Sequence, residues 1–82
     1  MTDESRVVVL VTAGCHLCED ACGVIAPICA ALGVGWVARD LAECDEATRV
    51  QWREYVPVVL IDGDVHDVFR VNADRFRAAL TD

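Results

Sequence analysis

Residues 6–22 read RVVVLVTAGCHLCEDAC, an apolar run followed at once by a cluster of three cysteines. The run shows no alternation of polar and apolar residues, as expected of a strand that is covered on both faces of a sheet. After a short turn, apolar residues recur at helical spacing from Cys15 to Leu32, and Gly33 is the stop signal. The stretch therefore predicts a strand, a turn and a helix whose first residues are cysteines.

A chain of 82 residues is long enough for one domain only, and its pattern of strands and helices predicts that residues 1–82 form a single α/β domain. The further predicted elements are a strand over 35–40, a short helix over 46–54 capped by Asp45, two strands around the hairpin signal Asp62-Gly63, and a helix capped by Asn72. The order is β-α-β-α-β-β-α. The first two connections are long enough for right-handed crossovers, so we expect strands one to three to be parallel and strand four to be antiparallel. Helices would cover both faces of this mixed four-stranded sheet.

The composition argues against several classes of partner. Fourteen acidic residues face seven arginines and no lysine, for a net charge of −7. Such a chain offers no basic surface to nucleic acid or to an anionic membrane, and we expect neither as a partner. The longest apolar run has five residues, and the acidic start MTDES does not resemble the basic beginning of a signal peptide. We therefore expect a cytoplasmic protein, and we also expect it to be a monomer. In that reducing compartment, five cysteines indicate catalysis, metal binding or packing.

The first helical turn favours a reactive thiol at Cys15. At the N-cap, its sulfur can accept hydrogen bonds from the free backbone N–H groups near Cys18, and the helix dipole adds partial positive charge. His16 adds charge when protonated, while Glu19 and Asp20 oppose it. We expect the pKa of Cys15 to lie below the usual value of about 8.5. Cys18 lies one turn further on, where it can attack a mixed disulfide on Cys15.

A second motif lies before the third predicted strand, where Val56-Pro57 is an X-Pro bond of the kind that can be cis. Together with Cys15-His16-Leu17-Cys18 after the first strand and the Asp62-Gly63 hairpin, it resembles the thioredoxin superfamily. Within that superfamily, the chain is similar to the short bacterial glutaredoxin-like proteins. The resemblance covers almost the whole sequence and implies the thioredoxin-like fold.

The resemblance implies a thiol-disulfide oxidoreductase in which Cys15 attacks and Cys18 resolves the mixed disulfide. It also implies that Pro57 is cis and faces the active-site disulfide, that Val56 offers its backbone to the substrate, and that His16 and Leu17 contact the substrate. No bound cofactor is required. Electrons would come from glutathione, another low-molecular-weight thiol or a reductase, and the substrate would be a disulfide-containing protein or a small thiol.

Two other functions remain open from the sequence. At about 100° per residue, Cys15, Cys18, Cys22 and Cys29 fall within roughly a 60° arc of one helix. Cys15, Cys18 and Cys22 could hold zinc, copper(I) or an iron–sulfur cluster with a fourth ligand. The chain could also be a redox-inert binding module that keeps the fold. We expect Cys29 and Cys44 to act as small buried hydrophobic residues.

Overall fold

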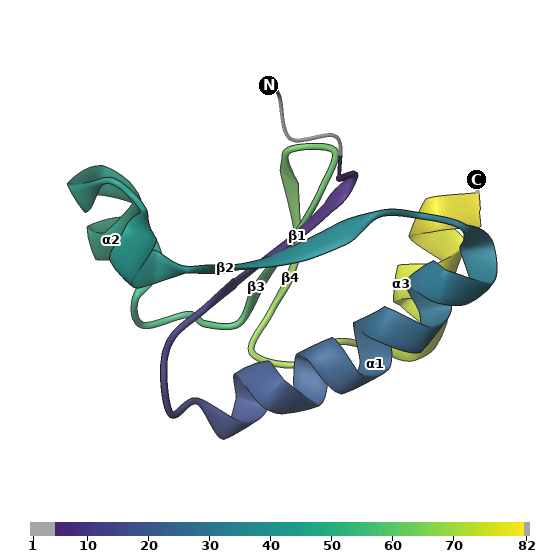
Figure 1. Cartoon of the computed structure of the whole chain (residues 1–82), viewed down its shortest axis with the longest axis horizontal. Coiled ribbons are helices and arrows are strands. Elements are labelled where there is room, and N and C mark those ends of the chain that lie inside the picture. Colours follow the sequence, from purple (N-terminus) through teal and green to yellow (C-terminus); the bar gives the residue numbers. More distant parts are fainter. Residues whose placement is uncertain (1–4, 82) are drawn as a thin grey trace.

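The computed structural model describes residues 5–81, so the acidic start from which we expect no signal peptide lies outside it except for Ser5. The elements are β1 (Val7–Val11), α1 (His16–Leu32), β2 (Trp36–Asp40), the 3₁₀ turn η1 (Leu41–Glu43), α2 (Glu46–Trp52), β3 (Val58–Ile61), β4 (Asp64–Val68) and α3 (Ala73–Thr81) (Figure 1). The predicted order of helices and strands is confirmed. Within residues 5–81, no helix is both long and apolar enough to cross a membrane.

The four strands form one mixed sheet in the order β2-β1-β3-β4. β1 and β2 are parallel, whereas β3 is antiparallel to both β1 and β4. The expectation that strands one to three are parallel was therefore wrong for β3. A parallel crossover needs a helix that returns along the sheet, but α2 has seven residues, about 10 Å of helix, and none of them is buried. Consequently β3 starts near the end of the sheet at which β2 ends, and it runs in the direction opposite to β1 and β2.

One face of the sheet carries the larger core. α1 and α3 lie side by side against it and contact each other (Figure 1). The buried residues of this core are Val7, Val9 and Val59 from the sheet, Ile25, Ile28 and Cys29 from α1, and Phe76 and Leu80 from α3. In β1 these inward-facing residues alternate with residues of the opposite face, as the pleat of a strand requires. The core thereby fixes α1 against the sheet, and with it the cysteines at its start.

The opposite face is covered more thinly. Its buried residues are Leu10, Leu41 and Val58, and Trp52 of α2 packs partly buried against them. Helices thus lie on both faces, as expected, although α2 contributes little beyond one aromatic ring. Cys44 and Val56 border this second cluster.

The predicted hairpin joins β3 and β4. Asp62 and Gly63 both have positive φ angles, 52° and 89°, the geometry that favours Asn or Asp followed by Gly in a two-residue hairpin turn. Arg6 donates two hydrogen bonds to the Asp62 carboxylate, at 3.1 and 3.0 Å. These hydrogen bonds lower the pKa of Asp62 and tie the turn to the start of β1.

Candidate active site

The turn between β1 and α1 places Cys15 at the start of the helix. Gly14 has a φ of 73°, a conformation that glycine adopts without steric penalty, and it redirects the chain after β1. Cys15 follows with extended backbone angles of −95° and 108° and is the N-cap residue of α1. The predicted N-cap is therefore confirmed. The cap directs the Cys15 sulfur toward the free N–H groups of the first turn.

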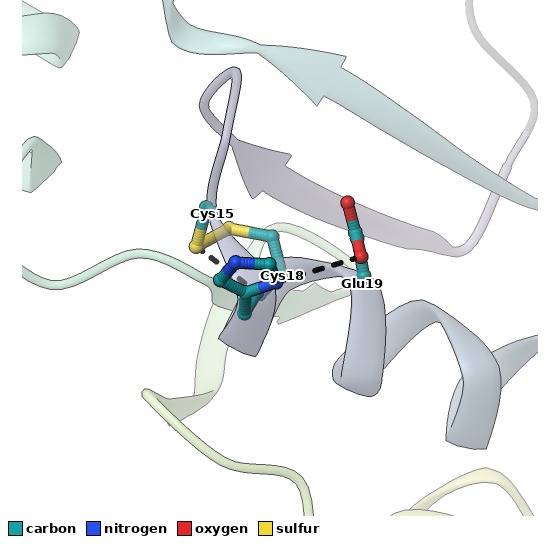
Figure 2. The surroundings of a disulfide bond; sticks show 4 residues. Cys15, Cys18 and Glu19 are labelled. Carbon is teal, nitrogen blue, oxygen red and sulfur yellow. Dashed lines mark hydrogen bonds and ion pairs between the residues drawn. A yellow bond between two sulfur atoms is a disulfide. The ribbon is translucent and has the colours of Figure 1, made fainter.

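The two cysteines of the motif are joined as a disulfide, with their Cα atoms 5.2 Å apart (Figure 2). The backbone N–H of Cys18 donates a hydrogen bond to the Cys15 sulfur, at 3.1 Å. Cys15 is half-buried, whereas Cys18 is only 3% exposed. Cys15 is thus the more accessible residue of the pair, and Cys18 is almost inaccessible.

The charged groups beside the disulfide partly offset each other. The imidazole of His16 is 94% exposed, and its Nδ1 lies 3.9 Å from a carboxylate oxygen of Glu19. This pair spans one helical turn. When His16 is protonated, it therefore offsets the Glu19 carboxylate, which opposes a thiolate in this turn.

A groove of about 380 Å³ opens beside the disulfide. Its walls include Val11 and Thr12, the three cysteines of the first two turns of α1, and Asp40 at the end of β2. Asp40 was not among the expected site residues. A signal for it existed, because β1 and β2 are parallel and Val11 pairs with Asp40, so the carboxyl ends of both strands meet at one edge.

The remaining thiols lie in less reactive surroundings. Cys22 is half-buried and lines the groove, and Cys29 is fully buried in the larger core. Burial raises the pKa of both thiols. The Cys44 thiol donates a weak hydrogen bond to the backbone oxygen of Asp40, at 3.6 Å.

A metal site at Cys15, Cys18 and Cys22 was the alternative drawn from the sequence. Across residues 5–81, no group of three or more His, Cys, Asp or Glu side chains is arranged to hold a metal ion. In the disulfide form, Cys15 and Cys18 have no thiolate to offer as a ligand. Metal binding therefore stays a prediction that concerns the reduced protein.

The Val56-Pro57 peptide bond is cis, as predicted. Pro57 is fully buried, and its backbone oxygen accepts a hydrogen bond from the N–H of Phe69, at 2.9 Å. Val56 is half-buried against the smaller core. The substrate contacts expected of Val56 and Pro57, and of His16 and Leu17, stay predictions.

Sequence reasoning missed an aromatic wall beside this loop. Phe69 has a φ of 69°, and the N–H of Arg70 bonds to the backbone oxygen of Val68 at 2.7 Å, which makes a tight γ-turn. Phe69 is 44% exposed and Tyr55 is 45% exposed, and the centroids of their rings lie 5.9 Å apart. A bulky residue at such a φ is an outlier that costs on the order of 1–3 kcal/mol. No sequence signal points to it, because such positions ordinarily take Gly or Asn.

Phe69 also borders a hollow of about 180 Å³ that reaches the cysteine motif. Leu17, which lies between Cys15 and Cys18, forms part of its wall, as do Ala21 and Val24 of α1. Two opposite charges, Asp20 and Arg70, complete the wall together with Val71. Both the hollow and the groove thus border the motif. Leu17 lines the hollow, and Cys15 and Cys18 line the groove.

Residues 6–81 match the family profile described as Glutaredoxin-like domain (DUF836). Among solved structures, the chain is similar to the X-ray structure of the Northeast Structural Genomics target protein XcR50 from X. campestris, with a TM-score of 0.72. The two are 23% identical over 90% of this chain and 93% of the other, a likeness that shows a common fold. A search of curated proteins gave no significant match. The chain thus has the thioredoxin-like fold and belongs to the glutaredoxin-like domain family of the thioredoxin superfamily.

Proposed function

We propose that this protein is a thiol-disulfide oxidoreductase whose redox centre is the Cys15–Cys18 pair. The observation that carries the proposal is the cap at the start of α1, where the N–H of Cys18 donates to the Cys15 sulfur at 3.1 Å. The same donor and the positive end of the 17-residue helix would stabilise a thiolate at Cys15 once the disulfide is reduced. Its partial exposure leaves it open to a substrate sulfur.

The reaction proceeds by two exchanges. The Cys15 thiolate attacks one sulfur of the substrate disulfide, and the other substrate sulfur leaves as a thiolate that takes up a proton. Cys18 then gives up its proton and attacks the Cys15 sulfur, so that the bond to the substrate breaks and the second substrate sulfur leaves. The protein dithiol loses two electrons and becomes the disulfide, while the substrate disulfide becomes two thiols.

The division of labour follows from burial. Cys18 is almost inaccessible, so an external disulfide reaches Cys15 first, and Cys18 is already within disulfide distance to resolve the adduct. The cycle needs no bound cofactor. Two equivalents of glutathione or of another low-molecular-weight thiol, or one turnover of a reductase, would return the pair to the dithiol.

The reduction potential of the pair tests this proposal. The protein would be equilibrated in glutathione buffers of stepped ratio, quenched in acid and alkylated, and the free thiols on each peptide would be counted by mass spectrometry. We expect one two-electron transition, confined to Cys15 and Cys18, between about −120 and −300 mV. A pair that stays oxidised below about −300 mV would be a structural disulfide and would contradict the proposal.

Cys22→Ser separates electron exchange from metal binding. Cys22 is not part of the disulfide, so the variant should keep the two-electron transition and the reduction of a model disulfide. The metal content of the reduced wild type would be measured in parallel. Stoichiometric zinc, copper or iron that disappears in Cys22→Ser would favour the metal site instead, because a third of the proposed protein ligands would be lost.

A further inference from the structure

The backbone at Phe69 departs from what its side chain ordinarily allows. Its φ of 69° suits glycine, and two backbone hydrogen bonds hold it: its own N–H to the oxygen of Pro57, and the N–H of Arg70 to the oxygen of Val68. Strained backbone of this kind tends to cluster at functional sites. The ring does not recover the strain by burial, since 44% of the residue stays exposed.

The position of the ring connects it to the redox centre. The backbone N–H of Phe69 donates a hydrogen bond to the oxygen of Pro57. Pro57 directly follows Val56, whose backbone the family resemblance assigns to the substrate. On its other side, Phe69 and Leu17 line one hollow, and Leu17 lies between the two redox cysteines. A substrate segment that presents its disulfide to Cys15 would therefore bring the side chains next to that disulfide toward the hollow lined by Phe69 and Leu17.

The chemistry of the hollow favours an apolar side chain. The carboxylate of Asp20 and the guanidinium of Arg70 are opposite charges in one wall, so the hollow has no net charge with which to select an ion. The other side chains that line it are apolar. Its volume of about 180 Å³ is enough for one large side chain, since a cavity of about 150 Å³ in another protein binds benzene.

We infer that Phe69, with the hollow it shares with Leu17, selects protein substrates that carry a large apolar side chain beside their disulfide cysteine. This inference rests on the proposed function and adds the class of substrate to it. The redox step is unchanged: the protein dithiol gives two electrons to the substrate disulfide, which becomes two thiols. Phe69 takes no part in that exchange and acts only on which disulfide is presented to Cys15.

Two peptides test the inference, identical except for leucine or serine next to the cysteine, each with that cysteine joined by a disulfide to 2-mercaptoethanol. Pre-reduced protein would be mixed with each peptide at pH 7 and the released peptide thiol followed by chromatography. We expect the wild type to reduce the leucine peptide about tenfold faster than the serine peptide. The variants Phe69→Gly and Phe69→Ala should bring this ratio close to one, because the leucine side chain loses its contact with the ring.

Val65→Ala is the matched control. Val65 is 48% exposed on β4 and does not line the hollow, so its truncation should keep the tenfold preference. A wild type without a preference, or Phe69 variants that retain it, would overturn the inference while leaving the redox proposal intact. Failure of the reduced wild type to act on either peptide would overturn the proposed function, and the inference with it.

A melting curve separates selection from a structural role for the ring. Phe69→Gly relieves the backbone strain that Phe69→Ala retains, so we expect the glycine variant to melt at least as high as the alanine variant. If both variants melt more than about 10 °C below the wild type, the ring belongs to the core and the inference is overturned.

Discussion

The start of α1 and its later turns carry the same residue type in opposite surroundings. At the N-cap, Cys15 is half-buried, and its sulfur accepts a hydrogen bond from the backbone N–H of Cys18 in the first turn. Further along the helix, Cys22 is half-buried and Cys29 fully buried, and burial raises the pKa of both. The N–H groups there are occupied by the bonds of the helix itself. Position along the helix, rather than the presence of a thiol, decides which sulfur can react.

The comparison also separates function from stability. The redox pair lies at the start of α1, after the end of β1. There the N-cap residue Cys15 can be replaced by another capping residue at little cost in stability. Cys29 lies in the larger core, where a polar replacement must find a partner. Substitutions at the two positions should therefore have opposite consequences.

Cys15→Ser should have the largest effect. Removal of the attacking sulfur is expected to lower the reduction of a model disulfide by at least about a thousandfold. Serine is a good N-cap, so the free energy of unfolding should stay within about 0.5 kcal/mol of that of the reduced wild type. Turnover and urea unfolding, each measured on the reduced proteins, check both halves. Substantial residual turnover would place the nucleophile elsewhere.

Cys29→Ser should do the reverse. A hydroxyl placed in the larger core is expected to reduce the free energy of unfolding by about 1–3 kcal/mol. Disulfide reduction by the folded variant should stay within about twofold of the wild type, because Cys29 does not touch the redox pair. Urea unfolding and a turnover assay at low temperature measure the two quantities. Loss of turnover without loss of stability would contradict the comparison.

Cys22 should give the smallest effect, and only in alkaline solution. Burial raises its folded-state pKa above the ordinary value of about 8.5, so well below that pH the thiol is neutral in both states. Above that, the unfolded chain releases the proton first, and the stability contributed by the neutral thiol is lost as the pH rises through the folded-state pKa. The difference in urea midpoint between the wild type and Cys22→Ala should therefore shrink from pH 8 to pH 10. A difference in urea midpoint that grows from pH 8 to pH 10 would contradict this prediction.

The sequence predicted the order of elements because each one has a local signal. The strand of five apolar residues, the helix with its cysteine cap, the Asp62-Gly63 turn and the cis Val56-Pro57 bond are all present in the structure. The direction of β3 was wrong because strand direction depends on whether the connecting helix returns along the sheet. Whether the helix returns along the sheet depends on how α2 packs, and the local pattern of polar and apolar residues does not indicate that.

The site was predicted less completely than the fold. Cys15 and Cys18 carry a motif, and a cap signal places them. Asp40 enters the groove only through the pairing of β1 with β2, and Phe69 enters the hollow only through a backbone conformation that its residue type disfavours. No local signal for Phe69 existed, because two backbone hydrogen bonds hold its conformation. The N–H of Phe69 donates to the oxygen of Pro57, which is remote in the sequence, and the N–H of Arg70 donates to the oxygen of Val68.

The alkylation rate of each cysteine tests the central claim most directly. The reduced, folded protein would be treated at pH 7 with limiting iodoacetamide, and the label on each peptide quantified by mass spectrometry. We expect Cys15 to react at least about tenfold faster than Cys22, Cys29 or Cys44, and the rates to converge when the chain is unfolded in guanidinium. Equal labelling of Cys15 and Cys44 in the folded protein would remove the argument for an activated thiolate and contradict the account.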